Sequence, residues 1–253
     1  MTVVPVLLYH AVTARPPPGL QRFTVHPHRF ADHLRVLRDA GRVGLTVSQF
    51  AACLRNGSGL PELPVVVTFD DGYADFLNAA ERLGIAGLPA TLYMTTGQIG
   101  AARMLTRRQL QSLGASVEVG AHSRTHPRLD ELAPGRLRDE VQGSKADLED
   151  LLQQPTRSFA YPHGDHDRQV RQTVIDAGFD SAAAVKNAFS HDRDDPFAIA
   201  RITVTAGTTA ERIGQWLQGR GAPAAWARER RRTRAYRSYR RVRRRLRPEV
   251  GQP

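Results

Sequence analysis

Two adjacent aspartates, Asp70 and Asp71, follow a short run of β-branched residues and are followed in turn by Gly72. The run, Val65–Phe69, predicts a buried strand, and glycine lets the chain turn sharply where that strand ends. Neighbouring side chains of a strand point to opposite faces, and two like charges this close are stable in a solvated turn or around a cation. A turn with an aspartate cap for the next helix explains the pair equally well, so this stretch alone does not decide.

Two histidines four residues apart, His122 and His126 in HSRTH, offer a second set of candidate ligands. They follow a predicted strand, Ser116–Ala121, where a turn can bring both imidazoles onto one cation. Two histidines and one carboxylate form a set that catalytic zinc uses, with a position left open for water. Isolated histidines at this spacing are more often surface or cap residues. Together with the aspartate pair at another strand end, they predict a metal site.

The remaining elements place further ionisable residues at strand ends. Strand-like and helix-like segments alternate, which favours an α/β fold with a mostly parallel sheet, and seven such units favour a (β/α) barrel. The carboxyl ends of parallel strands carry the site, and Tyr9-His10 and Pro162-His163-Gly164 also lie at such ends. The expected strands are Val3–Tyr9, Val65–Phe69, Ala90–Thr95, Ser116–Ala121, Ser158–Tyr161, Ser181–Val185 and Ile199–Thr203. The expected helices are Pro27–Ala40, Val47–Arg55, Tyr73–Leu83, Thr106–Leu113, Pro134–Gln153, Arg168–Ala177 and Thr209–Leu217.

The composition is that of an ordinary globular protein of 253 residues, with 41% hydrophobic and 24% charged residues. A single cysteine, Cys53, excludes an intrachain disulfide framework and does not support secretion. The apolar N-terminus lacks the basic start and the length of a signal peptide, and no stretch has the roughly 18 apolar residues of a membrane span. We therefore expect a cytoplasmic protein.

The net charge of +11 comes almost entirely from the C-terminal end, where residues 226–250 hold 12 arginines against 2 glutamates, a balance of +10. We expect a barrel domain over 1–220, then a linker and an Arg-rich tail over 221–253. Because the body is near neutral, nucleic-acid binding is not expected. A basic tail with tyrosines at helical spacing suits an anionic membrane surface, which would place the protein at the inner face of the membrane. A disordered, self-repelling tail is the simpler alternative.

Three motifs, TFDDGYAD, GAHSRTHPRL and SFAYPHG, in this order and spacing resemble the polysaccharide deacetylase family, carbohydrate esterase family four, which includes chitooligosaccharide deacetylases. The similarity runs over about residues 3–205. The N-terminal Tyr-His makes the layout closest to that of biofilm poly-N-acetylglucosamine deacetylases. The resemblance implies a distorted (β/α) barrel, a divalent metal (most simply zinc, with cobalt, nickel or manganese as alternatives) and removal of N- or O-acetyl groups from sugars.

The resemblance also assigns roles at the metal site. Asp71, His122 and His126 match the family's metal ligands, and Asp70 matches the general base. One carboxylate would hold the cation while its neighbour takes a proton from the attacking water.

The other carried-over roles concern the acetyl group and the leaving amine. The backbone N–H of His163, in the turn with Tyr161 and Pro162, would contact the oxyanion and the substrate. Arg201 occupies the place where most family members carry the histidine that acts as general acid. In the biofilm deacetylases that this sequence resembles, the histidine of the N-terminal Tyr-His motif acts as the acid. The resemblance therefore implies that His10 is the acid, with a strand-end histidine bonded into the barrel mouth as the alternative.

The third motif departs from the family pattern. Ala160 stands where an arginine is usual, His163 replaces a tyrosine, and Arg157 lies nearby but out of register. Asp180 lacks the tryptophan that usually accompanies it. These changes affect the expected sugar contacts and leave the metal site intact.

We expect a metal-dependent hydrolase that deacetylates an amino sugar or polysaccharide, with a lipid-linked substrate if the tail binds membranes. The alternatives are an amidohydrolase of the same fold acting on a non-carbohydrate amide, and a membrane- or polyanion-binding protein that uses the basic tail.

Overall fold

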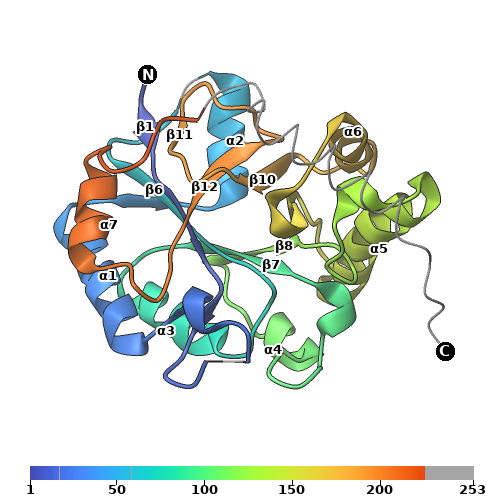
Figure 1. Ribbon diagram of the computed structural model, residues 1–253, viewed down its shortest axis with the longest axis horizontal. Coiled ribbons are helices and arrows are strands. Elements are labelled where there is room, and N and C mark those ends of the chain that lie inside the picture. The colour runs from blue at the N-terminus through green and yellow to red at the C-terminus, as the bar shows by residue number, and fades with distance from the viewer. Residues whose placement is uncertain (17, 58, 226–253) are drawn as a thin grey trace.

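The computed structural model describes residues 1–225, except positions 17 and 58. In this part of the chain, seven parallel strands form a closed barrel with helices packed around it (Figure 1), which confirms the expected (β/α) barrel. The strands follow one another round the barrel in the order β2 (Val6–Tyr9), β12 (Ile199–Thr203), β10 (Ser181–Val185), β9 (Ser158–Ala160), β8 (Val117–Ala121), β7 (Ala90–Met94) and β6 (Pro64–Phe69). Pairing of β2 with β6 closes the ring, and a short strand, β5 (Val43–Leu45), also pairs with β6.

The surrounding helices match the expected segments closely. They are α1 (Pro27–Asp39), α2 (Val47–Asn56), α3 (Phe76–Ile85), α4 (Arg107–Gln111), α5 (Pro134–Leu152), α6 (Arg168–Asp176) and α7 (Ala210–Leu217). Threonines at α2, α4 and α7 and an aspartate at α6 accept a hydrogen bond from the first turn, as N-cap residues do. Two pairs of two-residue strands complete the fold: β1 (Val3–Val4) with β11 (Ser190–His191), and β3 (Ala11–Val12) with β4 (Thr24–Val25).

Side chains along each strand alternate between the apolar layer under the helices and the barrel interior, which holds both apolar and polar side chains. In β6, Val65, Val67 and Phe69 pack in the large core beneath the helices. Val66 packs in a second cluster with residues of α2 and of other strands. Since side chains repeat with period two, Thr68 and then Asp70 continue the face of Val66. The barrel interior therefore changes from apolar to ionisable towards the carboxyl ends of the strands.

Two expectations about local structure were wrong. The first strand, expected over Val3–Tyr9, is divided at Pro5, which has no N–H to donate to a ladder. The helix expected from Tyr73 begins at Phe76, because Tyr73 forms an antiparallel bridge with Met104. The strand β5 was not anticipated.

The expected Arg-rich tail lies outside the described residues, apart from the segment 221–225. The proposed division between a barrel and a tail near residue 220 stays a prediction. Among the described residues, no helix combines the length and the apolar character that spanning a bilayer requires.

Candidate metal centre and catalytic residues

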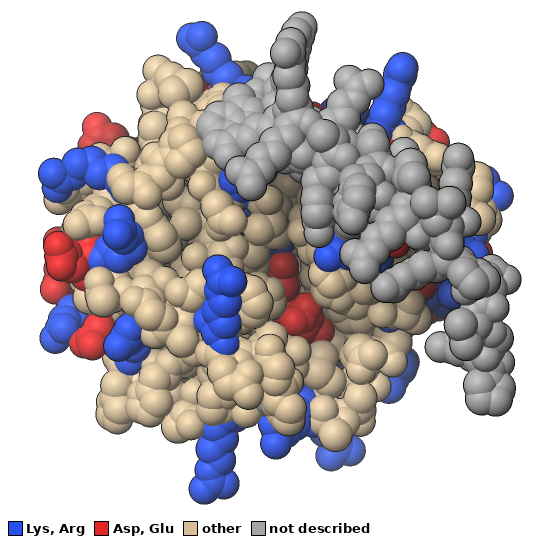
Figure 2. Space-filling model, viewed as in Figure 1, with Lys and Arg blue, Asp and Glu red and all other residues tan. Residues whose placement is uncertain are grey.

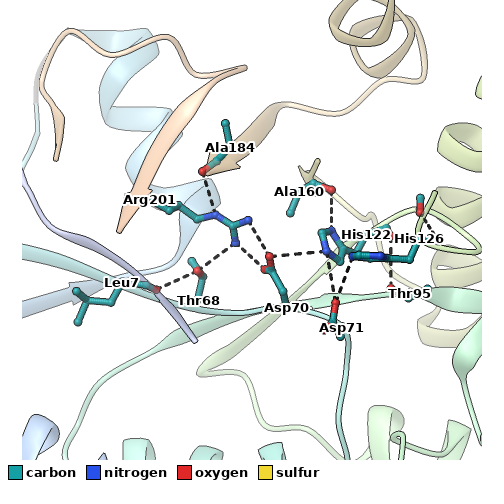
Figure 3. A network of polar contacts seen from close by, with 11 residues as sticks. Leu7, Thr68, Asp70, Asp71, Thr95, His122, His126, Ala160, Ala184 and Arg201 are labelled. Atoms are coloured by element: carbon teal, nitrogen blue, oxygen red, sulfur yellow. Dashed lines mark hydrogen bonds and ion pairs between the residues drawn. The ribbon is translucent and has the colours of Figure 1, made fainter. Parts of the chain in front are cut away.

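The structure brings Asp71, His122 and His126 together at the carboxyl ends of β6 and β8 (Figure 3). One ligand atom from each residue lies within 4.8 Å of the others. The His122 Nε2 atom is 3.6 Å and the His126 Nε2 atom 3.4 Å from the same oxygen, Asp71 Oδ1. Two imidazoles and one carboxylate at this spacing form a site that fits a divalent cation of the zinc type.

His122 is oriented for this purpose by its neighbours. Its backbone N–H bonds to Met94 O at 2.9 Å, and its Nδ1 atom lies 2.8 Å from Ala160 O. A carbonyl can only accept, so Nδ1 carries the proton and the Nε2 lone pair faces Asp71. Burial lowers the pKa of His122 to about 3, so the imidazole is neutral, as a metal ligand must be. Burial also lowers the pKa of His126.

Burial shifts the pKa of Asp71 in the opposite direction. Burial raises the pKa of its carboxyl to about 6; His10 lowers it, and the neighbouring Asp70 carboxylate raises it further. Interaction with the Tyr73 hydroxyl also lowers the pKa of Asp71. A cation bound between Asp71 and the histidines would favour the charged carboxylate.

Backbone strain is concentrated around this group. Asp71, Ser123, His126 and His163 all adopt left-handed φ angles, between 59° and 73°. Residues other than glycine adopt this conformation only where surrounding contacts enforce it, and such residues cluster at functional sites. The glycine between Asp71 and Tyr73 is required: a Cβ atom on Gly72 (φ +91°) would lie 2.1 Å from Met94 Sδ.

Asp70 points into the barrel and binds Arg201 (Figure 3). This contact was not predicted from the sequence. The guanidinium donates to both carboxylate oxygens, Nη1 to Oδ1 at 2.6 Å and Nη2 to Oδ2 at 2.8 Å. Arg201 is fully buried; it also donates to Thr68 Oγ1 and Ala184 O and lies over the Tyr93 ring at 5.3 Å. Burial alone would raise the pKa of Asp70, but the charge and the hydrogen bonds of the Arg201 guanidinium lower it to about 2. Asp70 is therefore an ionised carboxylate, with Oδ2 3.7 Å from His122 Nε2.

The other residues expected at the site lie around this centre. The His163 ring lies 4.6 Å from the His126 ring, centroid to centroid, in an exposed turn. His10 packs on Phe23, and its Nδ1 atom is buried without a hydrogen-bond partner among the described residues. A positive charge on the His10 ring would lower the pKa of both Asp70 and Asp71. Pro162 is buried.

Tyr161 and the residues around the altered third motif serve the fold. The Tyr161 side chain is buried in the core, and its hydroxyl donates to Phe197 O at 2.9 Å. Its backbone N–H donates to Ala183 O, and its carbonyl accepts from the Gly164 N–H. Asp180 pairs with Arg157 at 3.0 Å in an exposed ion pair. Trp216 packs in the core.

Comparisons with known proteins agree with this geometry. Residues 58–182 match the family described as polysaccharide deacetylase. YxkH of Bacillus subtilis (strain 168), whose name describes a polysaccharide deacetylase, is 24% identical over 217 residues, which cover 85% of this chain and 76% of that protein.

Solved structures show the same fold. The Streptococcus pyogenes deacetylase PplD, in complex with acetate, is 25% identical with a TM-score of 0.77, covering 84% of this chain and 96% of that one. IcaB from Ammonifex degensii shares the fold with a TM-score of 0.73 and 23% identity, over 86% of this chain and 98% of that one. The fold, the assembled side chains and these matches together identify residues 58–182 as a polysaccharide deacetylase domain.

Proposed function

We propose that the protein is a metal-dependent deacetylase that removes N-acetyl groups from an amino sugar or its polymer. The observation that carries the proposal is the convergence of Asp71, His122 and His126 on one point beside the ionised Asp70. A cation held by these three residues would supply Lewis acidity, which makes a water acidic enough to attack an acetyl carbonyl near neutral pH.

Asp70 is the general base in this proposal. Its carboxylate is ionised and held in one orientation by Arg201, and it lies beside the predicted metal position, where it can accept a proton from the attacking water. Because both of its oxygens receive hydrogen bonds from Arg201, an attacking water must donate to one of the remaining lone pairs. The arginine therefore fixes the direction from which the proton arrives.

The remaining steps use residues of the first strand and the third motif. His10 has a buried nitrogen without a partner among the described residues and is the proposed general acid for the leaving amine. The His163 backbone N–H is the proposed donor to the oxygen on which negative charge develops. Zinc is the proposed metal, on the chemistry of the donor set.

Metal analysis of the purified protein tests the proposal. We expect near one equivalent of zinc in the wild type and in His28→Ala, which removes an exposed histidine, and loss of zinc in His122→Ala. Acetate release should follow the same pattern, with N-acetylated glucosamine oligomers cleaved faster than O-acetylated sugars or small N-acetyl amides. Preference for the small amides would favour the amidohydrolase alternative. Absence of metal in the wild type after reconstitution would overturn the proposal.

The charge distribution argues against a polyanion as the ligand of the barrel. On the face seen in Figure 2, acidic side chains lie near the centre and along the left margin, interspersed with Lys and Arg side chains, so the described residues form no continuous basic patch on this face. The arginines over 226–250 support a separate proposal, that this segment binds an anionic membrane surface from the cytoplasmic side and brings the barrel to a lipid-linked substrate. Flotation with anionic liposomes, with and without residues 226–253, tests it, and equal binding would end it.

A further inference from the structure

The loop between the two candidate histidines is held from outside the barrel by a buried carboxylate of α5. Glu140 is only 3% exposed, yet its carboxylate accepts three hydrogen bonds from the loop 122–126, which we call the HSRTH loop. One oxygen accepts from the backbone N–H groups of Arg124, at 2.9 Å, and Thr125, at 2.8 Å. The other accepts from the Thr125 hydroxyl at 2.6 Å.

A second carboxylate of α5 fixes the same loop through a side chain. Asp147 binds the Arg124 guanidinium twice, from Nε at 2.9 Å and from Nη2 at 2.7 Å. Asp147 also accepts from the Thr96 hydroxyl at 2.7 Å. Between the two carboxylates, at the same face of α5, lies Gly143, where an added Cβ would come within 2.5 Å of Arg124 Nε. The absence of a side chain at Gly143 therefore leaves space for the Arg124 side chain against α5.

These contacts constrain the backbone between the two imidazoles. Ser123 and His126 both have left-handed φ angles, and the His126 N–H bonds to Ser123 Oγ at 3.0 Å. Glu140 binds the two residues that separate them. A buried carboxylate is expensive to desolvate, and an apolar side chain would serve helix packing at least as well. The position of Glu140 is therefore explained by the loop that it binds.

We propose that Glu140, assisted by Asp147, is a positioning residue that sets the distance between the His122 and His126 imidazoles and thereby the affinity of the site for a divalent cation. The inference rests on the proposed metal site. Supporting residues of this kind typically alter metal affinity by about 10- to 100-fold when they are changed.

The test compares the zinc dissociation constant, measured by chelator competition, with the thermal unfolding of the metal-free protein. Glu140→Gln keeps the size of the side chain but turns an NH₂ group towards the loop's donors. We expect it to weaken zinc binding about 10- to 100-fold, Asp147→Asn to weaken it less, and Asp150→Asn, an exposed change on the same helix, to leave it unchanged. A purely structural role would lower the unfolding temperature of the metal-free protein without changing the dissociation constant.

An unchanged dissociation constant in Glu140→Gln would overturn the inference. If that variant does not fold, Gly143→Ala replaces it: alanine favours the helix, but its Cβ displaces Arg124. Weaker zinc binding without loss of stability would support the inference, and unchanged binding would overturn it. Failure of the wild type to bind zinc would overturn the proposed function itself and this inference with it.

Discussion

Asp70 and His126 lie on opposite sides of the same group of side chains, and the fold holds them by different means. Asp70 stands in the barrel interior, where Arg201 and Thr68, both on strands, form a buried hydrogen-bonded chain with it. His126 lies in a loop outside the barrel, and its side chain is 31% exposed. Glu140 of α5 accepts hydrogen bonds from Arg124 and Thr125, the two residues that precede His126 in the loop.

This difference separates two properties of the site. On the strand side, formed by Thr68, Asp70 and Arg201, the closed sheet determines the orientation and the charge of the Asp70 carboxylate. On the loop side, formed by residues 122–126 and α5, hydrogen bonds from the loop to α5 determine the spacing of the His122 and His126 imidazoles. Changes on the strand side should therefore affect proton transfer and folding, and changes on the loop side should affect cation affinity.

Replacing the proposed base should produce the largest effect on the reaction and none on the metal. Asp70→Asn removes a proton acceptor but none of the three candidate ligands, so turnover should fall by about 10²- to 10⁴-fold while the zinc content stays near one equivalent. Acetate release and elemental analysis on the same preparation measure both. Loss of zinc together with turnover would mean that Asp70 belongs to the metal site.

Removing the partner of Asp70 should mainly reduce stability. Arg201→Met leaves a buried carboxylate without a counter-charge, and the free energy of unfolding should fall by about 3–5 kcal/mol. The double variant Asp70→Asn, Arg201→Met should regain much of this loss. Urea denaturation measures the effect. The control is Arg157→Met, which breaks the exposed pair with Asp180 and should cost at most about 1 kcal/mol. Equal losses of unfolding free energy in Arg201→Met and Arg157→Met would contradict the distinction between the buried and the exposed ion pair.

The smallest effect concerns pH. In the metal-free protein the pKa of Asp71 is raised to about 6, while burial lowers the pKa of both histidines. Below pH 6 a cation must displace one proton, from Asp71, so zinc affinity should fall about tenfold per pH unit there and be level above. Chelator competition between pH 5 and pH 7.5 measures the profile. A loss of two protons per cation would show that the histidines, not the carboxylate, titrate.

The sequence predicted the parts of the site that occur as local patterns. Asp71, His122 and His126 each follow a β-strand, and parallel strands bring such residues to one edge without further information. The alternation of strands and helices predicted the barrel for the same reason. The strand β5 was missed because it has three residues, one of them Gly44, and no periodicity can be read from so short a stretch.

The supporting residues could not be assigned, because their partners are distant in sequence. Arg201 was treated as a substituted histidine, yet an arginine within the apolar strand β12 is a signal, since arginine is rarely buried without a partner. Glu140 interrupts the apolar face of α5 between Leu137 and Val141, which is a similar signal. Either pattern indicates that a partner exists, but only the three-dimensional structure identifies it.

The closure of the barrel has a consequence for biosynthesis. The first barrel strand, β2, pairs with the last one, β12, and Asp70 meets its counter-charge 131 residues later in the chain. A polypeptide that has been made only as far as β10 has an open sheet and an unpaired Asp70. Because such distant contacts form late, we expect Asp70 to reach its folded environment only when the final strand is in place, and nascent chains that lack β12 to be inactive.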